Sequence, residues 1–186
     1  MLYEIFSLLL QVITALIAGT CLLRMYIQLC GVNMSLRSGI PIAPFVFALT
    51  NWLVHPLRRV VPSVGRLDSA SLVGAYSMLL LKYVVYWSIS EAAWHPLNLP
   101  IQAAIEWVST CISGLFWLVI IYVVASWVQS PSPMAYLIDL LVEPLLRPIR
   151  QAVPRLGGLD LSALVLIVSL QVAEIVLNHV SRLLLL

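Results

Sequence analysis

Two ionisable side chains stand inside otherwise apolar stretches of this sequence. Lys82 lies within residues 69–90, and Glu174 lies within residues 161–180, 92 positions further along the chain (82 to 174). A charge inside a bilayer costs about 2.5–3.5 kcal/mol on insertion scales, so two opposite charges at equal depth can form an ion pair. The alternative is that both side chains reach the outer headgroups, because aromatic and polar residues closely follow each of them.

An aspartate stands immediately before each of these two stretches, at Asp68 and Asp160. Each can cap a helix, because a carboxylate accepts the free N–H groups of the first turn and is favoured by the helix dipole. Each can also form a clasp on its loop, Asp68 with Arg58 or Arg59, and Asp160 with Arg150. The two roles are compatible.

Arginines supply nine of the ten basic residues and gather in two segments, 24–66 and 147–155. One interpretation is attraction to anionic lipids of the inner leaflet, at about 1 kcal/mol for each arginine. The other is specific binding of a partner. The candidate lipid- or partner-binding residues are Arg58, Arg59, Arg147, Arg150 and Arg155.

The sequence shows no arrangement of residues typical of an enzyme. It lacks a nucleophile elbow, a phosphate-binding loop and the spacing of a metal site, so we expect no catalysis, no cofactor and no bound metal. Haem ligation by a histidine ranks last among the functions considered. The isolated cysteines and histidines are Cys21, Cys30, Cys111, His55, His95 and His179.

The amino-acid composition indicates whether the chain folds in water or in a membrane. Apolar residues make up 62% of the 186 positions and charged residues only 10%, whereas a soluble domain carries about 25% charged residues. The net charge of +2 argues against nucleic-acid binding. We therefore expect a protein of the lipid bilayer.

Four apolar stretches are long enough to cross a bilayer as helices, at about 5–23, 69–90, 107–128 and 161–180. The arginine-bearing segments follow the first and third of them. The positive-inside rule then places both arginine segments in the cytoplasm and both termini outside, with Arg182 as the one dissenting charge.

The chain contains an internal repeat. Moving it by 92 positions lays residues 55–68 on residues 147–160 and superimposes two prolines, an arginine, a glycine and an aspartate. We predict two parallel helix–loop–helix copies, 1–90 and 105–186, joined by an outer linker at 91–104. The matched pairs are Pro56 and Pro148, Arg58 and Arg150, Pro62 and Pro154, Gly65 and Gly157, and Asp68 and Asp160.

Each copy also holds a short apolar segment that is too short to span a bilayer. These segments, Pro44 to Val54 and Met134 to Glu143, begin at or just after a proline. We predict amphipathic helices that lie in the membrane interface. They should end near Pro56 and Pro144, because proline disfavours helix in the preceding residue.

Two stretches resemble a known family. Residues 56–71 read Pro-Leu-Arg-Arg-Val-Val-Pro-Ser-Val-Gly-Arg-Leu-Asp-Ser-Ala-Ser, and residues 143–160 follow a Ser126-Trp127 pair. Their shared pattern, Pro-x-Arg followed by Pro-x-x-Gly-x-x-Asp, is similar to that of the YggT family, also called YlmG. One departure concerns an arginine that the family tends to place five residues before the tryptophan. Arg24 fits that place in the first copy, whereas the second copy has Tyr122.

The resemblance implies a small multi-pass protein of bacterial inner membranes or plastid membranes, with no catalytic residues to carry over. Relatives are associated with cofactor assembly onto a b-type cytochrome, with division or nucleoid organisation, and with osmotic tolerance. We favour a non-catalytic scaffold or assembly factor that uses its cytoplasmic loops to bind a membrane-protein partner or a second copy. The alternative is an oligomeric channel or transporter for ions or osmolytes.

Overall fold

The computed structural model describes residues 2–32, 40–63, 65, 67–89, 98–128, 132–152 and 161–184, and every element in these ranges is a helix. The order of long helix, shorter helix and long helix occurs twice. The helices are α1 (Leu2–Leu29), α2 (Ala43–Val60), α3 (Ser69–Ile89), α4 (Asn98–Val128), α5 (Pro133–Ala152) and α6 (Leu161–Leu184).

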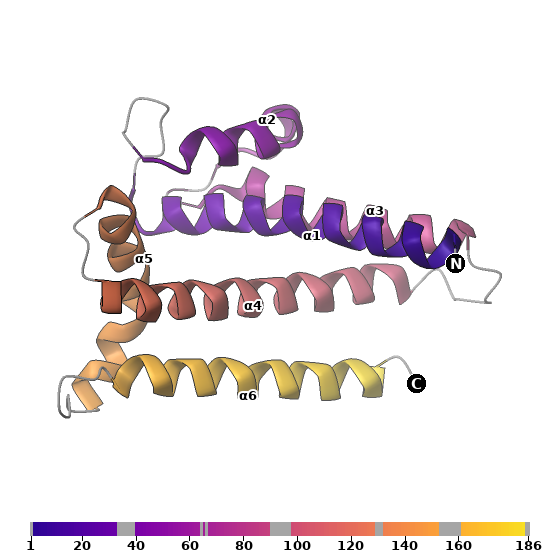
Figure 1. Cartoon of the computed structure of the whole chain (residues 1–186). Helices are drawn as coiled ribbons and strands as arrows, with labels where there is room; N and C mark the ends of the chain where they lie inside the picture. Colours follow the sequence, from indigo (N-terminus) through magenta and orange to yellow (C-terminus); the bar gives the residue numbers. More distant parts are fainter. Residues whose placement is uncertain are drawn as a thin grey trace.

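Four of these helices, α1, α3, α4 and α6, are long and apolar enough to cross a membrane. The shortest, α3, has 21 residues and extends about 32 Å, close to the thickness of the hydrocarbon core. Both termini lie at one end of the four helices, and α5 crosses the other end (Figure 1). The predicted all-helical membrane fold is confirmed.

The fourth helix begins earlier than the sequence pattern predicts. The expected span started at residue 107 after a linker ending at 104, whereas α4 begins at Asn98. Pro100 does not prevent this, because the backbone N–H groups of the first turn have no partner inside a helix anyway. The extension places Glu106 within the helix rather than beside it.

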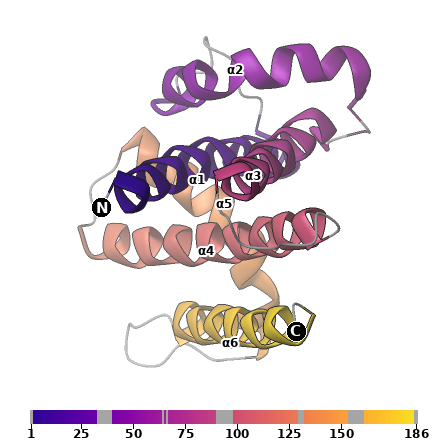
Figure 2. The ribbon, with the colours of Figure 1, turned by 90° about the vertical axis from the view of Figure 1, so that its right-hand side faces the viewer.

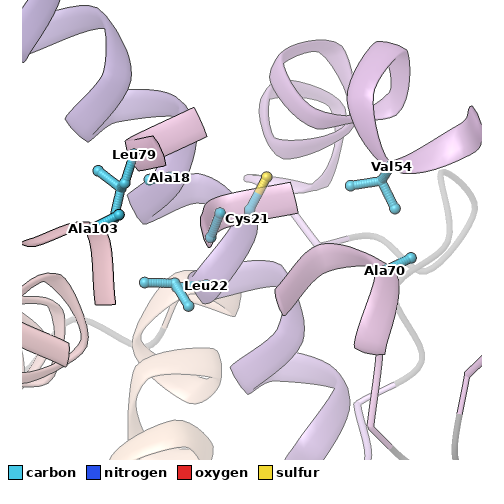
Figure 3. Close-up of a cluster of buried hydrophobic side chains, with 8 residues drawn as sticks. Ala18, Cys21, Leu22, Val54, Ala70, Leu79 and Ala103 are labelled. Atoms are coloured by element: carbon cyan, nitrogen blue, oxygen red, sulfur yellow. The ribbon is translucent and has the colours of Figure 1, made fainter. Parts of the chain in front are cut away.

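Small side chains allow the helices of the first half to approach closely. The central cluster joins α1, α2, α3 and the start of α4 (Figure 3). A Cβ atom built at Gly74 would lie 3.4 Å from the Leu53 side chain, so α2 rests almost directly on the backbone of α3. The buried members of the cluster are Ala18, Cys21, Leu22, Val54, Ala70, Ala75, Leu79 and Ala103.

The helix α5 links the two halves of the chain. Ile138, Val142 and Leu146 pack against α4 and α6, while Leu137 and Leu141 pack against Ile27 of α1. The Tyr26 hydroxyl of α1 also donates a hydrogen bond of 2.7 Å to the Leu141 carbonyl. Thus α5 contacts α1 of the first half as well as α4 and α6 of the second half.

The helices α2 and α5 do not stop at their prolines, and the predicted ends near Pro56 and Pro144 are wrong. The helix α2 continues to Val60, and α5 continues through both Pro144 and Pro148. All three prolines lie on exposed faces, where a carbonyl that has lost its N–H donor can be solvated. Packing of the opposite faces outweighs the local preference. The interfacial location of both helices stays a prediction.

The Tyr26 hydroxyl provides a test of how α5 is held. We expect Tyr26→Phe to speed hydrogen–deuterium exchange in α5, because it removes a hydrogen bond worth about 1 kcal/mol beside the Pro144 turn. Tyr76→Phe is the matched control, since that hydroxyl donates to the Pro100 carbonyl. Equal exchange of α5 in the wild type and in Tyr26→Phe would contradict the assignment.

Candidate functional site

Asp68 sits between two arginines just before α3. One of its carboxylate oxygens, Oδ2, lies 2.7 Å from an Arg58 guanidinium nitrogen and 3.6 Å from Nε of Arg24. The same oxygen accepts a hydrogen bond of 2.8 Å from the Ser71 hydroxyl. Asp68 is fully buried. We call Arg24, Arg58 and Asp68 the arginine clasp.

Arg24 connects the clasp to α2. Its guanidinium donates hydrogen bonds of 2.8 Å to the Thr50 hydroxyl and 2.9 Å to the Asn51 side-chain oxygen. It also lies 4.9 Å from the centre of the Phe47 ring, within the range of a cation–π contact. Arg24 is nearly buried, and its charge is compensated by groups of α2 and by Asp68.

The environment of Asp68 stabilises its charged form. Burial acts to raise its pKa, but hydrogen bonds from Arg58 and Ser71 and the charges of Arg58 and Arg24 outweigh burial and hold the pKa below its ordinary value. The Asp68 backbone carbonyl accepts the N–H groups of Ser71 and Leu72 at the start of α3. The side chain therefore forms the predicted type of clasp, while the backbone begins the helix.

The second half holds its arginine differently. Arg150, which matches Arg58 in the 92-residue register, donates a hydrogen bond of 2.6 Å to Glu143 and one of 2.9 Å to the Tyr122 hydroxyl. Tyr122 stands where the family tends to have an arginine, and its hydroxyl accepts a hydrogen bond from Arg150. Asp160 and Arg155 lie outside the described residues.

The structure does not bring Lys82 and Glu174 together. The nearly buried Lys82 forms an ion pair with Glu106 of α4, and Glu174 accepts a hydrogen bond of 2.6 Å from the Ser109 hydroxyl. The physical reason is the order of the helices, because α4 packs between α3 and α6 (Figure 2). Each predicted partner therefore meets a residue of α4 instead of the other.

Glu106 was not identified from the sequence as a partner, because residue 106 precedes the predicted span at 107–128. A signal was present in the spacing of Gln102, Glu106 and Ser109, which share one face of a helix at intervals of four and three residues. Of these residues, Glu106 binds Lys82 of α3 and Ser109 binds Glu174 of α6. The three residues share a face only if the helix begins before residue 102, which the hydropathy of the sequence did not indicate.

A groove of about 780 Å³ lies between the C-terminal end of α1 and the exposed side of α5. Tyr26 and Cys30 line one side, and Tyr136, Asp139 and Arg147 are among the residues that line the other. Arg147 and Arg59 are exposed and make no ion pair within the described ranges. In those same ranges, no three His, Cys, Asp or Glu side chains are grouped as a metal would require.

Comparisons with known proteins place this arrangement in a family. The family model described as CCB3/YggT matches residues 1–89 and 101–181. The uncharacterized protein YggT of Escherichia coli strain K12 is 36% identical over 133 residues, which are 71% of this chain and 69% of that protein. An uncharacterized Vibrio alginolyticus protein from the proC 3′ region is 35% identical over 75% of this chain and 77% of its own length. No solved structure matches.

The lowered pKa of Asp68 sets the direction of an acid response. Its stabilisation is fully present above the ordinary pKa of 3.8 and is lost as the pH falls through the lower, folded-state value. We expect Asp68→Asn to lower unfolding free energy by about 3 kcal/mol at neutral pH, because it leaves two arginines without their carboxylate. Thermal unfolding in lipid nanodiscs measures this. The variant should lose less stability than the wild type below about pH 4, and equal losses would contradict the assignment.

Exchanging charges distinguishes the two pairings of Lys82. Lys82→Glu and Glu106→Lys should each be destabilising, because each places like charges together in a poorly hydrated site. Combining them should recover most of the loss, of about 3 kcal/mol for each single change. Lys82→Glu with Glu174→Lys is the matched control, and it should show no recovery in the same unfolding measurement. Recovery in the control instead would support the pair expected from the sequence.

Proposed function

This chain belongs to the CCB3/YggT family of membrane proteins, and from that premise we propose that it is a non-catalytic scaffold or assembly factor of the bacterial inner membrane. Four of its six described helices are apolar enough to cross the bilayer, and the other two lie beside them. Little of the chain is available for a soluble activity. Its action then depends on surfaces that it offers to other molecules.

The groove between α1 and α5 is the observation that carries the proposal. The arginines most prominent in the sequence are occupied within the chain, since Arg24 and Arg58 bind Asp68 and Arg150 binds Glu143. Arg147 has no such partner within the described part of the chain, and it lines the groove. We therefore propose the surface of α5 in the groove, rather than both arginine loops, as the docking site.

The composition of this groove favours a protein segment over lipid alone. Acidic Asp139 lines the groove together with basic Arg147, and Asp139 would repel a purely anionic headgroup. Tyr136 is 71% exposed there, and exposed aromatic residues with arginines are enriched at protein interfaces. We propose that the cytoplasmic segment of another membrane protein, carrying at least one acidic residue, binds in the groove.

The exposed face of α2 has a different proposed role. Trp52 and Val60 are largely exposed. Arg59 precedes Val60, is also exposed, and makes no ion pair with another described residue. Aromatic and aliphatic side chains next to arginines suit the interface of an anionic leaflet. Lipid contact by α2 would orient the bundle while α5 binds the partner.

A channel for ions or osmolytes is the second candidate. The observation that favours it is the group of polar residues within the spans, Lys82 with Glu106 and Ser109 with Glu174. These residues bind one another, so a pore would require further copies to complete its wall. Flux of ions or glycine betaine into vesicles that contain the purified protein tests this candidate.

The docking proposal is tested at Arg147. A photo-crosslinking residue placed at Tyr136 in intact membranes should capture one specific protein, and Arg147→Glu should reduce its recovery about tenfold or more by like-charge repulsion. Arg182→Glu is the matched control, because that exposed arginine lies near the C-terminus at the opposite end of the bundle. Equal recovery with Arg147→Glu and with the control would contradict docking in the groove.

A further inference from the structure

Gln171 has an unusual position for a polar residue. It lies near the middle of the 24-residue α6, its side chain is exposed, and it makes no hydrogen bond within the described part of the chain. At that depth the surroundings of a spanning helix are hydrocarbon. An amide has both donors and an acceptor, and lipid tails satisfy neither.

Gln171 belongs to a row of exposed residues along α6, which we call the amide stripe. The intervals between its members alternate between four and three residues, the spacing needed for two helices to pack with a left-handed crossing. A second amide, Asn178, lies in the same row two turns away. The amide stripe consists of Leu164, Val168, Gln171, Ile175, Asn178 and Arg182.

Another exposed face of α6 has a different character. It presents Val165, Val172, Val176 and Leu183, which suit contact with lipid tails. The one hydroxyl on this face, of Ser169, is already satisfied by the Val165 carbonyl at 2.8 Å. The unpaired amides therefore lie on one side of the exposed surface and not around all of it.

The neighbouring helix does not satisfy the stripe. Glu174, which points toward α4, accepts the Ser109 hydroxyl and lies on the side of α6 adjacent to the stripe. On α4, the Ser109 hydroxyl is bound to Glu174 and the Glu106 carboxylate is bound to Lys82. The described residues of the chain supply no hydrogen-bond partner for Gln171, which directs attention to a partner on another molecule.

We propose that the amide stripe is the contact between two copies of this chain, related by a twofold axis along the membrane normal. All copies insert with the same orientation, so such an axis places each residue at the same depth as its counterpart. Gln171 would then meet Gln171 of the partner subunit. Because an amide both donates and accepts, this contact is self-complementary.

The other members of the stripe are compatible with this arrangement. Leu164, Val168 and Ile175 supply the apolar packing on either side of Gln171. Arg182 lies in the last turn of α6, where its Nε donates to the Asn178 carbonyl at 3.3 Å and its charge can reach the headgroups. In the proposed dimer the Arg182 side chains of the two copies would therefore lie in the hydrated headgroup region and would not be buried against each other. The proposal does not depend on the docking function of α5.

Cysteine crosslinking in lipid vesicles tests the contact. In a background with Cys21, Cys30 and Cys111 changed to alanine, Val168→Cys should form disulfide-linked dimers on mild oxidation. Val176→Cys is the matched control, because it is a valine of similar exposure on the lipid-facing side of the same helix. Equal crosslinking of the two variants would reveal random collision and overturn the proposal. So would crosslinking of Val168→Cys only to a different protein in native membranes.

Dimer dissociation in vesicles, followed by energy transfer between two labelled populations, provides a second measurement. Gln171→Leu should weaken association about tenfold, the effect of losing an interhelical hydrogen bond. Gln11→Leu removes the same amide from an exposed position on α1 and should leave association unchanged. An equal loss from both changes, or monomers at every wild-type concentration, would overturn the assignment to α6.

Discussion

The buried carboxylate of Asp68 is the interaction on which the first half of the structure depends. It binds an arginine from α1 and another from α2 immediately before α3 begins, so one side chain fixes three helices at one end of the bundle. A carboxylate close to two guanidinium groups is stable where little water enters, whereas burying any one of these three charged groups alone would be costly. The small residues of the adjacent cluster then allow α2 and α3 to approach closely.

The second half reaches a related arrangement by different chemistry. Tyr122 and Glu143 bind Arg150, and α5 depends on its apolar faces and on Tyr26 to hold its place. The exposed surfaces of α4 and α6 are correspondingly larger. Only 6% and 11% of the residues in their most apolar stretches are buried, against 28% for α1 and for α3. The second half also carries the amide stripe and, through α5, one side of the groove.

Particular elements show how far the sequence could be used to predict the structure. The spans, the common end of the two termini and a clasp between Asp68 and a nearby arginine follow from hydropathy, helix direction and local charge, whereas the choice of Arg58 over Arg59 comes from the structure. The ends of α2 and α5 do not, because the preference of a single proline is a local effect that the packing of a whole face outweighs. The start of α4 was missed for a similar reason, since Gln102 and Glu106 lower the hydropathy of a turn that α3 nevertheless stabilises through Lys82.

The sequence by itself determined that this is a membrane protein, which segments are long and apolar enough to cross a bilayer, and which family it resembles, because these properties depend on composition and on patterns along one chain. Only the tertiary structure decided which polar groups meet. The pattern correctly placed Lys82 and Glu174 within spanning helices, but their partners depend on the lateral order of those helices, and α4 packs between them. Lateral order arises from the fit of faces on separate helices, and no spacing within a single segment records it.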